Sequence, residues 1–250
     1  MTEPTRGVIF GREADVYELS RPSYPAAALE HVRALVDART AVEVGAGTGK
    51  ATVGLARAGM SLTCIEPSPQ MAEILRSKQL PGVEVVVSTF EEWQGAPASL
   101  DLIFAAQAWH WVDQRTAYRR SLELLRPRGA IALMWNIPLD RYAVFEHVYA
   151  EHAPELLSEL DRRIHKRDSV TWSGDLELAG FTEVSRFTHI WGERVSAEGV
   201  RALYSTYSDH LLLPERQREA LLDGLASAVR ASGGSIEMEY RTEVFSGRKP

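Results

Sequence analysis

A glycine-rich turn between residues 41 and 50 carries the residue types that point most directly to chemistry. The apolar stretch 41–44 contains Glu43 and runs into Gly45, Ala46, Gly47, Thr48 and Gly49. Glycines at alternate positions remove the Cβ atoms that would hold a ligand away from the turn, and they allow positive φ angles between a strand and a helix. We therefore expect a ligand to contact the main chain directly at this turn.

A second acid, Glu66, follows the turn by about 20 residues, a spacing typical of nucleotide sites. It closes the next apolar run, residues 62–65. A carboxylate at the tip of that neighbouring strand can accept the protons of both ribose hydroxyls, and its charge disfavours the 2′-phosphate of NADP. The turn and this acid together predict a site for an adenosine-containing cofactor.

The spacing of the turn separates three cofactors. A P-loop needs Gly-x-x-x-x-Gly-Lys-Ser/Thr, but Val44 stands where the first glycine belongs and Ala51 follows Lys50, so a P-loop is excluded. The dinucleotide fingerprint needs a glycine where this chain has Lys50, which makes NAD the weaker alternative. The remaining pattern is Glu43 before three glycines, an acid that would repel phosphate but could engage an ammonium, directly or through water. S-adenosylmethionine has that ammonium and no phosphate, and its product would be S-adenosylhomocysteine.

At this point the chain resembles the class I S-adenosylmethionine-dependent methyltransferases. The resemblance rests on three motifs in order along the chain, at residues 42–49 (VEVGAGTG), 64–68 (CIEPS) and 125–129 (LRPRG). It is closest to the small-molecule branch of that family, because of residues 17–25 (YELSRPSYP) and 106–111 (AQAWHW). The resemblance implies methyl transfer from S-adenosylmethionine to a small-molecule acceptor.

The likeness is uneven along the chain. It covers residues 10–136, and the remainder only by architecture. One departure is Arg128, where relatives usually have a second glycine before the fifth strand. This departure puts only a local turn in doubt.

The order of apolar segments predicts the fold. Strand-like and helical patterns alternate, which is typical of a parallel sheet with helices on both faces. The predicted strands are 41–44, 62–66, 83–87, 100–106, 130–135, 181–191 and 236–245. The predicted helices start near Pro25, run over 50–58, from Ser68 through Lys78 and from Asp113 to Leu125, and continue over 139–160, 162–168 and 196–231. The fold class is thus α/β: a Rossmann-like, mostly parallel seven-stranded sheet whose last strand is antiparallel, as the family has it.

We expect one domain over residues 1–250. Its core would comprise about 25–136 and 175–250, and residues 8–24 would form an N-terminal lid. A helical cap would be inserted after the fifth strand over about 137–174, with a contribution from 196–231. The cap helices should cover the carboxyl ends of the strands, where open parallel sheets bind ligands.

The composition limits the partners. At 250 residues, with 45% hydrophobic and 25% charged residues, the chain has the make-up of an ordinary globular protein. Its net charge of −6 argues against general nucleic-acid binding, which needs clustered Lys and Arg. We therefore expect a small-molecule acceptor, no nucleic acid, and a monomer or homodimer.

Targeting signals are not evident either. Residues 1–6 lack the apolar core of a signal peptide, and no apolar run approaches the ~20 residues of a membrane span. Cys64 is the only cysteine, so no internal disulfide can form. These features predict a cytoplasmic protein without a membrane partner.

The resemblance also implies which residues contact the cofactor. Thr89 and Phe90 follow the third strand, where relatives contact the adenine, and Gln107 ends the fourth strand beside the amino-acid tail. Arg21 could pair with the cofactor carboxylate or form a surface salt bridge. The expected cofactor-binding residues are Tyr17, Arg21, Glu43, Gly45, Ala46, Gly47, Glu66, Pro67, Met71, Thr89, Phe90 and Gln107.

His110 is the expected catalytic residue, because the resemblance places it at the mouth of the site. It would act as a base or bind the acceptor, or else make a structural hydrogen bond near Asp113. Tyr24, Trp109 and Trp111 would line the acceptor site, with core packing as the alternative for the tryptophans. No histidine pair has ligand spacing, so no metal is expected.

Three points stay open in the sequence. The acceptor is an apolar or aromatic metabolite, or a carboxylate if the cap turns a basic run inward. That run comprises Arg162, Arg163, His165, Lys166 and Arg167. The chain could also bind the cofactor without methyl transfer, using its charge for a cyclisation or elimination, or act as a regulatory partner.

Overall fold

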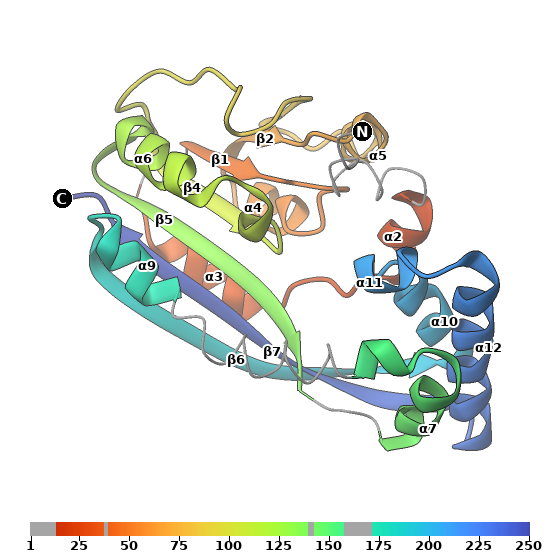
Figure 1. Cartoon of the computed structure of the whole chain (residues 1–250). Coiled ribbons are helices and arrows are strands. Elements are labelled where there is room, and N and C mark those ends of the chain that lie inside the picture. Colours follow the sequence, from red (N-terminus) through yellow and green to blue (C-terminus); the bar gives the residue numbers. More distant parts are fainter. Residues whose placement is uncertain (1–13, 38–39, 140–142, 158–171) are drawn as a thin grey trace.

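A seven-stranded sheet organises the computed structural model, which describes residues 14–37, 40–139, 143–157 and 172–250 (Figure 1). The strand order is β3-β2-β1-β4-β5-β7-β6, and β7 is antiparallel to both of its neighbours while β1 to β5 pair in parallel. The strands are β1 (Thr40–Val44), β2 (Ser61–Ile65), β3 (Val83–Val86), β4 (Leu100–Ala106), β5 (Leu125–Pro138), β6 (Thr182–Ser196) and β7 (Ser235–Arg248). The predicted fold class is confirmed, including the antiparallel last strand.

Helices cover both faces of the sheet because its central strands are apolar on both faces. Along β4, Leu102 and Phe104 belong to an apolar cluster with α3, α4 and α5, whereas Ile103 and Ala105 belong to a cluster with α6 and α9. The helices are α2 (Ala14–Ser20), α3 (Ala26–Ala34), α4 (Thr52–Arg57), α5 (Pro69–Ser77), α6 (Gln114–Leu124), α7 (Ala143–His152), α9 (Trp172–Leu178), α10 (Ala197–Ser205), α11 (Ser208–Leu211) and α12 (Glu215–Ala231). A short 3-10 helix, η2, spans Trp109–Trp111.

The cap has an apolar core of its own. Strands β5 and β6 run past their predicted ends toward the cap, and their pairing with β7 continues to Pro138 opposite Tyr240 and to Ser196 opposite Ser235. In this part of β7, Met238 and Tyr240 pack with side chains of α7, α10 and α12 in a third buried cluster. The long strands therefore carry the cap, which lies at one end of the sheet (Figure 1).

The predicted helical stretch 196–231 is divided into α10, α11 and α12. Thr206 ends α10 and Pro214 precedes α12, where a proline is compatible with a helix start but not with the interior of a continuous helix. The helix predicted over 139–160 is shorter, since α7 ends at His152. The predicted cap at Ser68 is confirmed, with its Oγ accepting a hydrogen bond from the Met71 N–H at 3.4 Å. The break at Thr206 places a polar group next to the lid.

Part of the predicted lid and cap lies outside the described residues. This applies to residues 8–13 of the lid and to the basic run of the cap, Arg162, Arg163, His165, Lys166 and Arg167. The predicted domain boundaries stay a prediction. No helix in the described ranges is both long enough and apolar enough to cross a bilayer.

Candidate active site

The glycine turn is fastened to the end of β2 by main-chain hydrogen bonds. The N–H groups of Gly45 and Ala46 both donate to the carbonyl oxygen of Ile65, at 2.8 and 3.1 Å. Gly45 has φ of +66°, and a Cβ added there would lie 2.5 Å from the Cβ of Ala108. Glycine is therefore required at this position by both conformation and space.

Gly47 faces a more open space. Its φ is +57°, and among the described residues a Cβ added to it would meet only the Met71 sulfur, at 3.9 Å. The Met71 side chain thus lies beside the turn, and its contact with an adenine stays a prediction. Pro67 is exposed between β2 and α5, and Ala46 is buried in the turn.

Glu66 is held in place by two main-chain donors. Its Oε2 accepts from the Gly47 N–H and its Oε1 from the Ser68 N–H, both at 2.8 Å. Burial raises the pKa of Glu66, while the two hydrogen bonds act in the opposite direction. Because each carboxylate oxygen has a second lone pair, Glu66 can still accept one hydroxyl proton on each oxygen.

Glu43 lies on the face of β1 that is covered by α4. Its Oε2 accepts from the Thr52 hydroxyl at 2.6 Å, and the Cys64 thiol lies 3.8 Å away. Burial raises the pKa of Glu43 to about 7, although the hydrogen bonds from Thr52 and Cys64 lower it. The sequence anticipated the acid but not its coupling to Thr52 and Cys64.

Helix α2 forms a lid that contacts both the nucleotide-binding half and the cap. Burial raises the pKa of Tyr17 on this helix, and among the charges that act on it Arg21 lowers it while Glu66 raises it. Glu18 forms an ion pair of 2.7 Å with Lys78 at the end of α5. The predicted helical spacing brings the Arg21 guanidinium to 5.4 Å from the centroid of the Tyr17 ring, and the contact of Tyr17 with the cofactor stays a prediction.

Arg21 attaches the lid to the cap. Its Nε and Nη2 donate to the side-chain and main-chain oxygens of Thr206, both at 2.8 Å. Its guanidinium also lies over the rings of Tyr207 and Tyr17, at 4.5 and 5.4 Å from their centroids. The structure thus gives Arg21 partners that the sequence did not suggest, and its contact with a cofactor carboxylate stays a prediction.

The carboxyl ends of β4 and β5 are joined by a side chain. Gln107 has φ of +56°, and its Nε2 donates to the main-chain oxygen of Asn136 at 2.9 Å. Asn136 is buried, and its Nδ2 donates to the carbonyl oxygen of Ser23, between the lid and α3. Tyr24, the next residue, is partly buried against the apolar cluster of α3 and α4.

The aromatic residues after β3 and β4 are not all placed alike. His110 is exposed, and its ring contacts that of Trp111, which is 43% exposed. Trp109 is fully buried between Phe90 and Tyr118, with ring centroids 6.0 and 5.3 Å away. Core packing, the alternative for Trp109, therefore describes its position in this structure, and its contact with an acceptor stays a prediction.

Thr89 and Phe90 also differ in exposure. Phe90 is buried in the same apolar cluster, whereas Thr89 is exposed and its hydroxyl accepts from the Glu92 N–H at 3.3 Å. Only Thr89 of this pair presents atoms to the surface. An adenine contact by Phe90 would require that its surroundings open.

Asp101, an acid away from the glycine turn, is engaged in structural bonds. Asp101, at the amino end of β4, accepts from Arg126 and from the Thr40 N–H at 2.7 and 3.0 Å. Within the described parts of the chain, no cluster of three or more His, Cys, Asp or Glu side chains could hold a metal.

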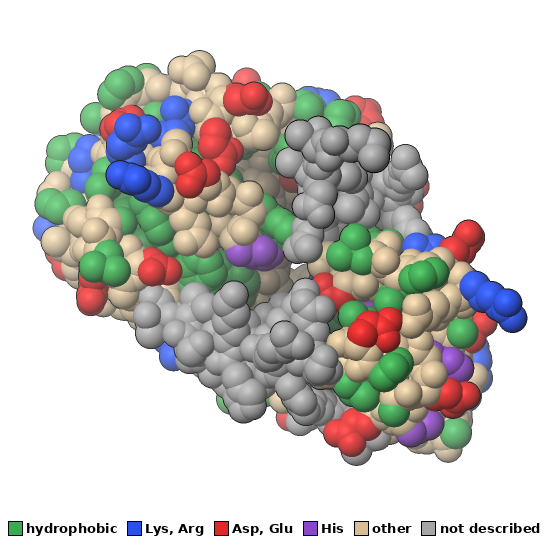
Figure 2. All heavy atoms as spheres, viewed as in Figure 1, with side chains coloured by type: hydrophobic (Ala, Val, Ile, Leu, Met, Phe, Trp, Pro, Cys, Tyr) green, Lys and Arg blue, Asp and Glu red, His purple; other side chains and the backbone are tan. Residues whose placement is uncertain are grey.

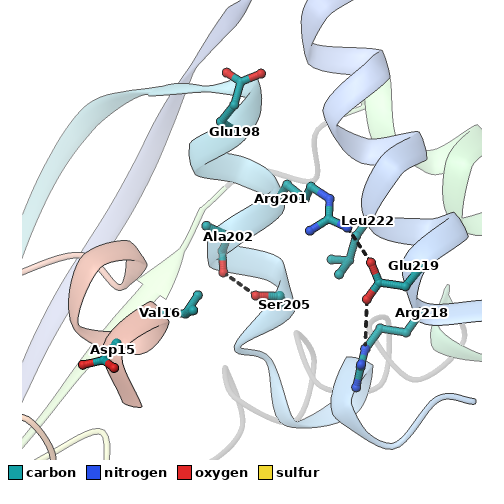
Figure 3. Close-up of a pocket in the computed structure, with 9 residues that line it drawn as sticks. All are labelled: Asp15, Val16, Glu198, Arg201, Ala202, Ser205, Arg218, Glu219 and Leu222. Atoms are coloured by element: carbon teal, nitrogen blue, oxygen red, sulfur yellow. Dashed lines mark hydrogen bonds and ion pairs between the residues drawn. The ribbon is translucent and has the colours of Figure 1, made fainter. Parts of the chain in front are cut away.

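A pocket of about 490 Å³ lies apart from the glycine turn, between α2, α10 and α12 (Figure 3). Arg201 on one wall pairs with Glu219, which also pairs with Arg218 (Figure 3). Arg201 pairs with Asp223 as well. These cations are compensated, so the pocket is not an evident anion site. It does reveal that the outer side of the lid is separated from the cap by a hollow.

Sequence reasoning missed three residues that organise the site: Asn136, Thr206 and Tyr207. Asn136 had a detectable signal, because it is a polar residue at the carboxyl end of a strand, like Glu66 and Gln107. Thr206 and Tyr207 had none, since their partner Arg21 is 185 residues away in the sequence.

Comparisons with known proteins agree with this geometry. Residues 42–133 match the family model described as a methyltransferase domain. An uncharacterized methyltransferase of Mycobacterium tuberculosis is 31% identical over 214 residues, which cover 86% of this chain and 82% of the relative. An uncharacterized methyltransferase-like protein of Schizosaccharomyces pombe is 26% identical over 93% of this chain and 92% of its own.

Solved structures share the fold. A candidate type II methyltransferase of Anaeromyxobacter dehalogenans has a TM-score of 0.69 at 22% identity, over 91% of this chain and 97% of its own. Phosphoethanolamine N-methyltransferase 2 of Haemonchus contortus, bound to phosphomonomethylethanolamine and S-adenosylhomocysteine, has a TM-score of 0.53 at 14% identity, over 100% and 58% of the two chains. At these identities the likeness concerns the fold alone.

Proposed function

Because the chain belongs to the class I S-adenosylmethionine-dependent methyltransferase family, we propose that it transfers a methyl group to a small-molecule acceptor in a pocket under the lid. The observation that carries the proposal is the orientation of Glu66 beside the open face of Gly47. These two residues match what an adenosine without phosphate requires: hydroxyl acceptors and a turn that a ligand can approach closely.

The residues present fit the cofactor. Glu66 would hold the ribose hydroxyls, Met71 and Thr89 would flank the adenine, and Gln107 and Arg21 would hold the amino-acid tail. Gly45 and Ala46 shape the turn, and Glu43 adds a buried acid beneath it. S-adenosylmethionine would supply an activated methyl group, and the departing thioether needs no proton.

The chain's own contribution would then be positioning and exclusion of water. Tyr17 on the lid and Tyr24 on its linker would close the site, and Trp111 would give the acceptor an aromatic wall. His110 would take a proton from an acceptor that has one to lose, because it is exposed in η2, three residues after Gln107 at the end of β4.

Charge favours a small acceptor over nucleic acid. On the face in Figure 2, Lys and Arg side chains lie among Asp and Glu side chains rather than forming a continuous basic surface. We therefore propose that the reaction takes place on a small molecule. We further propose that it needs no metal and that the protein acts as a monomer or homodimer.

Calorimetry with S-adenosylhomocysteine tests the proposal. Glu66→Ala should weaken binding by about 1–3 kcal/mol, because the ribose hydroxyls lose their acceptor. Glu84→Ala, an exposed acid on β3, serves as the matched control and should bind like the unsubstituted protein. Heat with nicotinamide dinucleotides but none with S-adenosylhomocysteine would refute the cofactor assignment.

A labelled-methyl assay tests turnover. Label from S-adenosylmethionine should appear in a small acceptor from a panel of apolar, aromatic and carboxylate metabolites. A product without the label, formed only in the presence of the cofactor, would favour cyclisation or elimination instead.

A further inference from the structure

Asn136 links four segments through a directional chain of hydrogen bonds. The Trp191 indole N–H donates to the Thr242 hydroxyl at 2.7 Å, and Thr242 donates to Asn136 Oδ1 at 2.6 Å. Asn136 Nδ2 then donates to the carbonyl oxygen of Ser23 at 3.2 Å, and its main-chain oxygen accepts from Gln107 at 2.9 Å. The chain of bonds thus runs from β6 through β7 and β5 to the lid linker, residues 21–25, with a branch to the end of β4.

The donor and acceptor groups fix the direction of this series of hydrogen bonds. An indole N–H can only donate, so the Thr242 oxygen accepts from it and the single hydroxyl proton goes to Asn136. The amide oxygen of Asn136 must therefore face Thr242, and the amide nitrogen must face Ser23. Both ends of this buried amide are satisfied, and asparagine is the residue of this size that can accept on one side and donate on the other.

The lid depends on few attachments. On its outer side, Val16 and Asp15 line the pocket of Figure 3 together with residues of α10 and α12, so a hollow separates part of that side from the cap. In the described part of the chain, polar contacts anchor the lid and its linker from Glu18 to Lys78, from Arg21 to Thr206 and from Ser23 to Asn136. Of these anchors, only Asn136 also contacts the residue expected to hold the cofactor tail, Gln107.

We propose that Asn136 is a positioning residue that holds the lid linker by its side-chain amide and Gln107 by its main-chain oxygen, so that the closed lid and the predicted cofactor-tail site are set by one residue. The proposal rests on the proposed function for the role of Gln107. Loss of the Asn136 amide donor would release Ser23 and leave the sheet itself paired. The lid would open more often, and a bound cofactor product would leave faster while entering at much the same rate.

Two substitutions test the coupling, and two others serve as rescue and control. Asn136→Asp places a carboxylate oxygen against the Ser23 carbonyl, and Thr242→Val removes the hydroxyl that orients the amide. Thr242→Ser keeps that hydroxyl and should therefore keep the Asn136 amide in its orientation. Ser246→Ala removes another buried hydroxyl of β7, which bonds to Ser185 at 3.0 Å and not to the lid linker.

The measurements are hydrogen–deuterium exchange of the full chain without cofactor, and the dissociation rate of S-adenosylhomocysteine by stopped flow. In Asn136→Asp and Thr242→Val, exchange over residues 14–25 and the dissociation rate should each rise about tenfold, as expected for one lost buried hydrogen bond. Exchange in β1 and β4 and the association rate should stay close to those of the unsubstituted protein. Thr242→Ser and Ser246→Ala should change neither quantity.

Each other outcome counts against a specific claim. Equal increases of exchange in the lid and in β1 and β4 would show that Asn136 stabilises the fold as a whole and not the lid in particular. Unchanged exchange in the lid would refute the link between Asn136 and the lid. A lid that exchanges faster with an unaltered dissociation rate would refute its role in holding the cofactor. If the unsubstituted protein does not bind S-adenosylhomocysteine, the proposed function fails, whereas exchange in the lid still decides the link to Ser23.

Discussion

Replacement of Glu43 by glutamine should make the protein more stable at neutral and alkaline pH. Glu43 is 1% exposed, and burial raises its pKa from an ordinary value of 4.5 to about 7. At about 1.4 kcal/mol for each pH unit, this displacement corresponds to about 3 kcal/mol. Glutamine has nearly the same shape and keeps an oxygen that can accept from Thr52, but it carries no charge to bury.

The sign follows from where the proton is held. Below the unfolded pKa both states are protonated, so Glu43 makes no difference to the pH dependence of stability. Between 4.5 and about 7 the unfolded chain releases the proton while the folded protein keeps it, so the free energy of unfolding falls as pH rises. Above about 7 the loss is complete and constant.

The assay is urea unfolding of the unsubstituted protein and Glu43→Gln from about pH 4 to about pH 8, the range in which the two titrations occur. The difference between the variants isolates Glu43, because all other groups are common to both. It should grow by about 3 kcal/mol in favour of Glu43→Gln across this range. A difference that stays flat, or that grows in favour of the unsubstituted protein, would refute the burial argument.

Thr52→Val provides an independent check of the same reasoning. The hydroxyl of Thr52 donates to Glu43 at 2.6 Å and lowers its pKa against the effect of burial. Removal of this donor should raise the pKa of Glu43 further, so that the free energy of unfolding keeps falling to a higher pH than in the unsubstituted protein. An unchanged pH window would mean that Thr52 does not stabilise the carboxylate.

Three further predictions concern the turns and the proposed base. Arg128→Gly should stabilise the protein by about 1 kcal/mol in urea unfolding, because Arg128 has φ of +62°, and a loss of stability would contradict the argument from strain. Gly45→Ala should destabilise by about 1–2 kcal/mol from conformation and a further ~1–3 kcal/mol from its contact with Ala108. Gly234 has φ of +83°, and among the described residues no atom lies within 4 Å of an added Cβ, so Gly234→Ala should show only the conformational loss of stability. Equal losses of stability in Gly45→Ala and Gly234→Ala would disprove the contribution from the contact with Ala108. His110→Ala should slow methyl transfer by about 10²-fold with unchanged S-adenosylhomocysteine affinity, and an unaltered rate would remove His110 from the mechanism.

The turn and its acid were predictable because their requirements are local. Gly45 and Gly47 have positive φ as expected, and Glu66 lies at the tip of β2 with its carboxylate bonded to the turn. Arg128, the one departure from the family motif, adopts the left-handed conformation that the usual glycine would favour. The succession of strands and helices along the chain followed from the alternation of apolar segments with helical patterns, and the antiparallel last strand followed from the family resemblance.

Burial of single aromatic residues was not predictable in the same way. Trp109 and Trp111 are two residues apart in one short motif, yet one is fully buried and the other is 43% exposed. Sequence spacing places both near the end of β4, but only the packing of Phe90 and Tyr118 decides which ring enters the core. The cap-side ends of β5 and β6 extend beyond the predicted ends for a related reason, because they pair with the part of β7 whose side chains pack in the cap.

What the sequence by itself determined was therefore the cofactor half: a parallel sheet, a glycine turn with an acid on the next strand, and the family. Tertiary structure alone decided how the lid is held, because its anchors join residues far apart in the chain, such as Arg21 with Thr206 and Ser23 with Asn136. Propensity and periodicity act over a few residues, whereas these bonds exist only after the cap and the sheet have packed.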